Sequence, residues 1–96
     1  MSIRFEWDEA KNRANRKRHG VSFEEARTVF LDENARLIAD PDHSADEDRF
    51  LLLGLSLRLR LLVVSHCFRQ SDEVVRIISA RRADPTERRD YGRWLK

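Results

Sequence analysis

The sequence predicts a single α+β domain, residues 1–96, in which helices pack on an antiparallel β-sheet. Ninety-six residues suffice for one domain with a modest core. Apolar residues in the first third follow helical spacing, whereas the second half contains β-rich apolar runs with short connections. Helices followed by a group of strands are typical of the α+β class.

The chain is expected to begin with a short strand over residues 3–7 and a helix over residues 8–20. Asp8 is a good N-cap for this helix, and Gly20 is a typical C-terminal stop. The helix is polar nearly all round. We therefore expect it to lie on the surface or against a polar partner.

A second helix is expected over residues 22–32, where Ser22 and Glu25 have the spacing of a capping box. Its apolar residues share one face and would point to the core: Phe23, Ala26, Val29 and Phe30.

The middle of the chain is expected to form strands. Residues 35–40 are a candidate strand, and the acidic segment 41–48 follows it. The apolar runs 49–56, 60–68 and 74–81 have short connections, so they should pair as an antiparallel meander.

A closing helix is expected over residues 84–96. Asp84 would cap it, and Pro85 would take the first helical position, where its missing N–H costs nothing. The expected order of elements is then β-α-α-β-β-β-β-α.

Several classes of protein are excluded by the composition. No run of about 18 apolar residues exists, so we expect no membrane span. The N-terminus is charged from the fourth residue and does not resemble a secretory signal. Cys67 is the one cysteine, which rules out an internal disulfide and suits the reducing cytoplasm; we expect it to be a buried core thiol.

Metal and cofactor sites are not expected either. The histidines and the cysteine include no pair at metal-ligand spacing, and no glycine-rich phosphate loop is present. His43, in the acidic segment, is expected to be solvated. His19 either caps its helix C-terminus or faces a basic cleft.

Positive charge is concentrated at the two ends of the chain. Residues 1–20 carry six Lys/Arg against three Asp/Glu, and residues 76–96 carry seven against three. If the ends meet in space, they form a basic patch that attracts phosphates; otherwise, each is a solvated helix whose charges pair locally.

The strands carry the residues with the clearest chemical potential. Alternation places Arg60 and His66 on one face of strand 60–68, near its two ends. Arg76 interrupts an apolar strand, so it must reach solvent, pair with an acid or bind a phosphate. Arg81 leaves the same strand as the next turn begins.

This group of residues suits RNA cleavage without a metal. That reaction needs a base for the 2′-OH, cations for the phosphate and a proton for the leaving 5′-oxygen. Arginine forks match two phosphate oxygens, and histidine or tyrosine can carry the proton.

Two motifs carry a resemblance to a known family. The segments "FEWDEAKNRANRKRHGVSFEEA" and "VVRIISARRADPTERRDY" closely resemble the BrnT toxins of bacterial type II toxin–antitoxin systems. The likeness spans about residues 5 to 91 in the same order and spacing. It implies a compact fold similar to RelE-type ribonucleases and an enzyme that cleaves RNA without a metal and halts translation.

The resemblance also implies partners. A BrnA-like antitoxin with a DNA-binding domain of ribbon-helix-helix type would neutralise the toxin. The two proteins would form a hetero-oligomer that reaches operator DNA through the antitoxin and represses their operon.

Carried onto this chain, the resemblance assigns a set of site residues. We expect phosphate binding and transition-state neutralisation from Arg60, Arg76 and Arg81 in one pocket, with Lys11 as a further cation. Tyr91 or His66 is the expected proton carrier. Further RNA contacts are expected from Arg82, Arg88, Arg89 and His19.

Two other functions remain open at this point. The chain could bind nucleic acid without cutting it, or act only as a co-repressor with a DNA-binding partner. The acidic segment 41–48 is either a recognition loop or a solvated connector.

Overall fold

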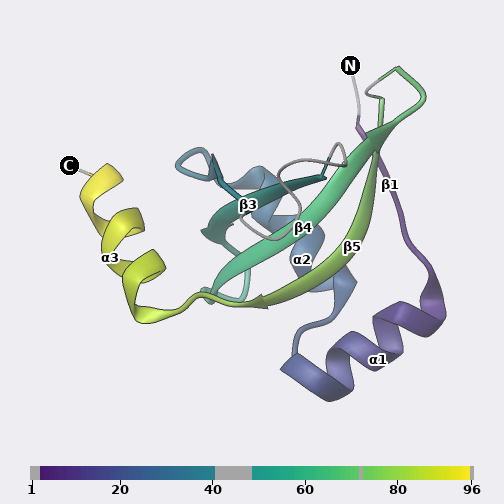
Figure 1. Ribbon diagram of the computed structural model, residues 1–96, viewed down its shortest axis with the longest axis horizontal. Coiled ribbons are helices and arrows are strands. Elements are labelled where there is room, and N and C mark those ends of the chain that lie inside the picture. The colour runs from purple at the N-terminus through teal and green to yellow at the C-terminus, as the bar shows by residue number, and fades with distance from the viewer. Residues whose placement is uncertain (1–2, 41–48, 72, 96) are drawn as a thin grey trace.

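The computed structural model describes residues 3–40, 49–71 and 73–95, and it confirms the expected α+β class (Figure 1). The acidic segment 41–48, including His43, lies outside the described residues. In chain order the elements are β1 (Arg4–Glu6), α1 (Glu9–His19), α2 (Phe23–Thr28), the 3₁₀ turn η1 (Val29–Leu31), β2 (Arg36–Ile38), β3 (Arg49–Leu55), β4 (Leu61–Arg69), β5 (Val74–Arg82) and α3 (Pro85–Trp94). No described helix is both long enough and apolar enough to cross a membrane.

The five strands form one mixed sheet in the order β1-β5-β4-β3-β2. Strands β3, β4 and β5 form the predicted antiparallel meander, and β2 adds to its edge by pairing antiparallel with β3. The first strand is different, because β1 pairs in parallel with β5 at the far end of the chain. The expectation of a purely antiparallel sheet is therefore wrong at this edge, since the sequence of a short strand does not specify its partner.

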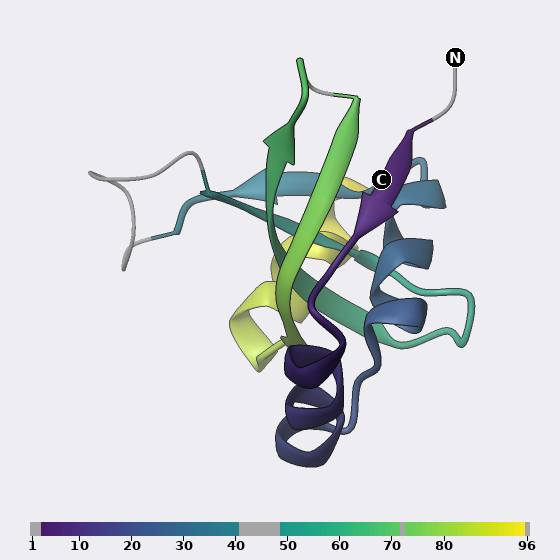
Figure 2. The ribbon, with the colours of Figure 1, turned by 90° about the vertical axis from the view of Figure 1, so that its right-hand side faces the viewer.

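Each face of the sheet is covered by different helices (Figure 2). On one face, which we call the α2 face, Phe23 packs with β-sheet residues such as Leu62 and Val75. On the other, the α3 face, Tyr91 packs with Leu53 and Val63. Because strand side chains alternate, β4 contributes its even-numbered residues to one core and its odd-numbered residues to the other.

The polar helix α1 is held by buried amides rather than by an apolar stripe. Asn15 Nδ2 donates to the carbonyl oxygens of Val21 and Ala80 at 2.8 and 2.9 Å, and Asn15 Oδ1 accepts from Ala80 N at 3.2 Å. Asn12 Oδ1 accepts from Phe23 N at 2.8 Å. The expected polar partner of this helix is thus the backbone of β5 and of the segment that leads into α2.

The helix ends are capped by the residues that the sequence predicted, with one exception. Asp8 caps α1, Gly20 adopts the left-handed conformation (φ 71°) that ends it, and Asp84 and Glu87 form a capping box at α3. Ser22 caps α2 through Glu25 N. The Glu25 side chain, however, does not complete the expected capping box.

A β-bulge in β5 changes which face its residues occupy. Ser65 of β4 is opposite Ser79, but the next residue of β4, His66, is opposite Ile77, so Ile78 is an extra residue. Arg76, before the bulge, is opposite Cys67, and Arg81, after it, is opposite Val63; both partners are odd-numbered residues of β4. Strict alternation would have placed Arg76 and Arg81 on opposite faces, whereas the bulge places both on the α3 face.

Candidate functional site

The first of the expected phosphate ligands, Arg60, is part of an ion pair on the α2 face. Its Nε donates to Glu25 Oε2 at 3.0 Å, its Nη2 forms a second bond to Glu25 Oε1, and Nη2 also donates to the Gly20 carbonyl at 3.0 Å. Glu25 is buried, and the hydrogen bond from Arg60 holds its pKa below the ordinary value. Ser56 Oγ donates to the same carboxylate at 2.7 Å.

Arg81 is engaged in the same way at the same end of the sheet, but on the α3 face. Its Nη1 and Nη2 donate to the two carboxylate oxygens of Glu87 at 2.9 Å each. Glu87 also accepts from Asp84 N, and the bond from Arg81 lowers its pKa. This pair therefore joins the end of β5 to the first turn of α3.

The expected convergence of Arg60, Arg76 and Arg81 is wrong. Arg60 faces α2, whereas the other two lie on the α3 face. Arg76 and Arg81 oppose residues four apart on β4, roughly 13 Å along the strand. Each guanidinium has a different carboxylate partner, which for Arg76 is Glu6. The sequence could not reveal which acid would face each arginine.

His66 was expected near one end of its strand, at the margin of the sheet area that other elements cover. The structure places it in the core instead. It is 1% exposed, and its ring lies 4.9 Å from Phe30 and 5.4 Å from Phe68. Nδ1 donates to the Val64 carbonyl at 3.1 Å. Burial lowers the pKa of His66, so the imidazole is held neutral where no substrate can contact it.

Tyr91 has a structural partner. Its hydroxyl donates to Asp32 Oδ2 at 2.6 Å, which links α3 to the segment after η1. Burial, together with the neighbouring Asp32 carboxylate, raises the pKa of Tyr91 to about 12. A phenol that holds its proton so firmly, and is buried, is poorly suited to the role of proton carrier.

Four cations from separate elements line one hollow on the α3 face, at the end of the sheet away from α3. The hollow has a volume of about 480 Å³. Its cations are Lys11 of α1, Arg49 of β3, Arg69 of β4 and Arg76 of β5, and it is completed by Cys67, Phe68 and Ile78. The expected meeting of the two basic ends thus occurs between Lys11 and Arg76.

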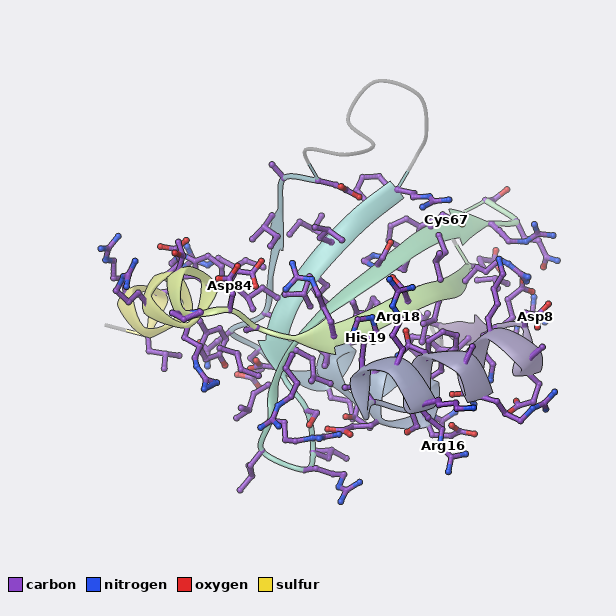
Figure 3. All side chains as sticks on the ribbon, turned by 60° about the horizontal axis from the view of Figure 1, so that its bottom comes forward. Asp8, Arg16, Arg18, His19, Cys67 and Asp84 are labelled. Atoms are coloured by element: carbon purple, nitrogen blue, oxygen red, sulfur yellow. The ribbon has the colours of Figure 1, made fainter. Side chains whose placement is uncertain are left out.

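A second hollow of about 340 Å³ shares Lys11 and Ile78 with the first. It adds Arg18 and His19 from the last turn of α1, which project toward the sheet in Figure 3, whereas Arg16 projects away from it. We call the two adjoining hollows the basic groove, defined by Lys11, Arg18, His19, Arg49, Arg69 and Arg76. Of the two options for His19, the groove position is the one it occupies.

Among the residues that the structure describes, Glu6 and Asp8 border the basic groove. Glu6 Oε2 accepts from both Arg69 Nε and Arg76 Nη1 at 2.9 Å. The pKa of Asp8 is lowered, mainly by the hydrogen bond from Lys11 N and to a lesser degree by the charge of Arg76. The groove is cationic, but its arginines are already oriented by an internal anion.

The remaining expected RNA contacts do not line this groove. Arg82 is opposite Leu62, which places it toward the α2 face, and it is exposed. Arg88 and Arg89 are exposed on α3. None of the three lines either hollow of the groove.

The prediction from the sequence did not include three residues of the basic groove, Arg18, Arg49 and Arg69. Its placement of Cys67 in the core was wrong. Cys67 is partly exposed and lines the hollow rather than the core. One signal could have found two of the arginines: Arg49 begins one strand and Arg69 ends the next, so an antiparallel pair brings them to the same end of the sheet. Within the described ranges, no three His, Cys, Asp or Glu side chains are grouped as metal ligands would be.

The fold and the groove define a small α+β domain with one face suited to a polyanion. The profile of the family described as "Ribonuclease toxin, BrnT, of type II toxin-antitoxin system" matches residues 7–87. The chain therefore belongs to the BrnT family of ribonuclease toxins.

A solved structure supports the fold. The chain is similar to the 1.1 Å crystal structure of the Brucella abortus ribonuclease toxin BrnT, with a TM-score of 0.66 and 22% sequence identity, over 86% of this chain and 99% of that one. At this identity the likeness speaks for the fold alone. Curated protein sequences gave no match.

Proposed function

We propose that this BrnT protein is a metal-independent endoribonuclease that binds RNA in the basic groove. The observation that carries the proposal is the hollow in which Lys11, Arg49, Arg69 and Arg76 meet, in a chain of a ribonuclease toxin family. Cations from four elements that line one hollow attract the negatively charged phosphodiesters of RNA and can donate hydrogen bonds to their oxygens. They are fixed on strands and a helix rather than on loops, which favours accurate geometry.

The proposed reaction is an internal transfer of the phosphoryl group. The 2′-oxygen loses its proton and attacks the adjacent phosphorus, and the bond from phosphorus to the 5′-oxygen breaks. The leaving 5′-oxygen takes up a proton, and the products are a 2′,3′-cyclic phosphate and a 5′-hydroxyl. Arg76 and Lys11 neutralise the negative charge that grows on the phosphoryl oxygens.

His19 replaces His66 and Tyr91 as the proposed proton carrier. It is exposed and lines the groove with Lys11, whereas His66 is buried and Tyr91 is bonded to Asp32. An imidazole can accept a proton from the 2′-OH and return one to a leaving oxygen near neutral pH.

The toxin–antitoxin family implies an antitoxin, and we infer a BrnA-like protein with a ribbon-helix-helix domain. In this proposal the antitoxin neutralises the toxin in a cytoplasmic hetero-oligomer and brings it to operator DNA. The basic groove itself is reserved for RNA.

The test is cleavage of a mixed-sequence RNA by the purified chain with and without EDTA. Equal rates, and products that end in a cyclic phosphate, support the proposal. Binding of RNA without any cleavage would favour the non-catalytic alternative, and a rate abolished by EDTA and restored by a divalent cation would overturn the metal-free reaction.

A further inference from the structure

Three exposed leucines meet at the hairpin between β3 and β4. Leu57 and Leu59 of the hairpin are 69% and 78% exposed, and Leu31 of η1 is 69% exposed. All three line a hollow of about 210 Å³, which is completed by Thr28, Asp32, Leu55 and Ser56. We call Leu31, Leu57 and Leu59 the leucine patch. None of its residues belongs to the basic groove.

The hairpin does not need leucine for its own folding. Leu59 has a φ of 63°, in the left-handed region that favours glycine, asparagine and aspartate and disfavours a bulky side chain. Its side chain is exposed, so burial within this chain does not offset the strained backbone. Strain kept at an exposed apolar residue indicates a role outside the folded chain itself.

The patch is also rigidly held. Leu57 N donates to Thr28 Oγ1 at 2.9 Å, and Leu59 N donates to the Ser56 carbonyl at 2.9 Å. Ser56 Oγ accepts from Arg58 N and Arg60 N while donating to buried Glu25. A surface fixed in this way loses little conformational entropy when a partner binds it.

Charge beside the patch selects the chemistry of the partner. Arg27 directly precedes Thr28, which lines the hollow; it is exposed and forms no ion pair with any residue in the described part of the chain. Arg58 lies between the two hairpin leucines in the sequence, but its side chain lines a different hollow, with Glu24 and Glu25. Asp32, the acid in the hollow, is already bonded to Tyr91 and to Leu55 N. An apolar anchor flanked by acidic side chains complements this surface.

We propose that the leucine patch is the docking surface for the antitoxin, and that the docked element is an amphipathic helix with aliphatic residues on one face and acidic residues beside them. This inference rests on the proposed function, since it assumes a toxin with a neutralising partner. A helix laid into a short apolar groove is a common mode of recognition, and a central aliphatic anchor carries most of its affinity.

The experiment measures binding of the purified product of the adjacent reading frame to the full chain. Leu59→Asp and Leu57→Asp are the test variants; aspartate tolerates the left-handed backbone at position 59. Leu95→Asp is the matched control, because Leu95 is 53% exposed but lies outside the patch. We expect each test variant to weaken binding by about 30-fold or more and the control to bind as the unmodified chain does.

Leu59→Gly separates binding from folding. Glycine relieves the backbone strain, so this variant should melt no lower than the unmodified chain and still lose the partner. For the charge, Arg27→Glu should weaken binding, whereas Arg13→Glu on the exposed side of α1 should not.

RNA cleavage by the free variants is measured in parallel. If neither the unmodified chain nor any variant cleaves RNA, the proposed function fails. The binding measurements still test whether the leucine patch is the docking surface. Unchanged affinity in both aspartate variants overturns the docking proposal. The proposal is also overturned if the unmodified chain does not bind the product of the adjacent reading frame, or if the patch serves only to form a dimer of this chain.

Discussion

Glu6 and Arg76 face each other across the parallel pair of β1 and β5, with Glu6 Oε2 2.9 Å from Arg76 Nη1. The same oxygen accepts from Arg69. This carboxylate oxygen occupies a position on the two guanidiniums that a phosphate oxygen would take. An incoming RNA must therefore compete with Glu6 for both arginines.

Glu6→Gln should raise RNA affinity by about 3- to 10-fold at low salt, since it removes the competing charge. Affinity is measured with a fully 2′-O-methylated oligonucleotide, which lacks the nucleophile, over a range of salt concentrations. Glu33→Gln, an exposed acid outside the groove, is the control. Equal affinity of both variants would contradict a role for Glu6 in the groove.

Arg76→Ala should lower the rate of RNA cleavage by about 100- to 1000-fold, because it removes a cation that stabilises the transition state. Its stability should change by no more than about 1 kcal/mol, because the pair with Glu6 is partly solvated. Arg81→Ala should behave in the opposite way, with a lower melting temperature and a nearly unchanged rate. A loss of rate in Arg81→Ala as large as that in Arg76→Ala would return Arg81 to the site, as the sequence predicted.

Arg60→Ala should destabilise the fold by about 2–4 kcal/mol, because it leaves the Glu25 carboxylate buried without its cation. Arg13→Ala, on the exposed side of α1, should change stability by less than about 0.5 kcal/mol. Denaturant unfolding provides both values. Because the pKa of folded Glu25 is depressed, this stabilisation is present above pH 4.5 and is lost as the pH falls through the folded pKa.

The raised pKa of Tyr91 predicts that the folded chain loses stability at high pH. Its pKa is raised from 10.0 to about 12 in the folded chain, so the neutral phenol stabilises the fold below pH 10. That contribution, on the order of 2 kcal/mol, should vanish between pH 10 and 12. The difference in unfolding free energy between the unmodified chain and Tyr91→Phe should shrink over this range. A constant difference would show that the phenol does not titrate as proposed.

Asn15→Asp should lower the free energy of unfolding by about 2–4 kcal/mol. The aspartate could still accept from Ala80 N, but it could not donate to the carbonyls of Val21 and Ala80. Asn34→Asp, at an exposed position, serves as the control in thermal unfolding. If the two variants have the same melting temperature, the buried amide does not hold α1 to the sheet.

The sequence predicted local structure well because local residues determine it. Asp8, Gly20 and Asp84 mark helix ends through bonds to their own neighbours, and the apolar runs after residue 48 pair as expected. The parallel partner of β1 and the bulge at Ile78 depend on contacts far along the chain. Neither leaves a signal in one sequence.

The candidate site was predicted only in part for the same reason. Lys11, His19 and Arg76 do line one groove, although they come from opposite ends of the chain. Arg60 and Arg81 were indistinguishable from Arg76 in the sequence, since the positions of Glu25 and Glu87 relative to them depend on the fold. His66 alternated as expected, and Phe68 lies two residues further along the same strand. The other two phenylalanines that enclose it, Phe30 and Phe50, come from elsewhere in the chain.

The extra residue at Ile78 makes this toxin sensitive to a change of length in a way that substitutions would not reveal. Removing that one residue would reverse the inside–outside phase of everything N-terminal or C-terminal to it. Either Arg76 would rotate out of reach of Lys11, or Arg81 would turn away from Glu87 and leave the last helix without its anchor. Deletion of that single codon should therefore remove one of these contacts and part of the core together, since Val75 and Ile77 precede Ile78 and Ala80 follows it.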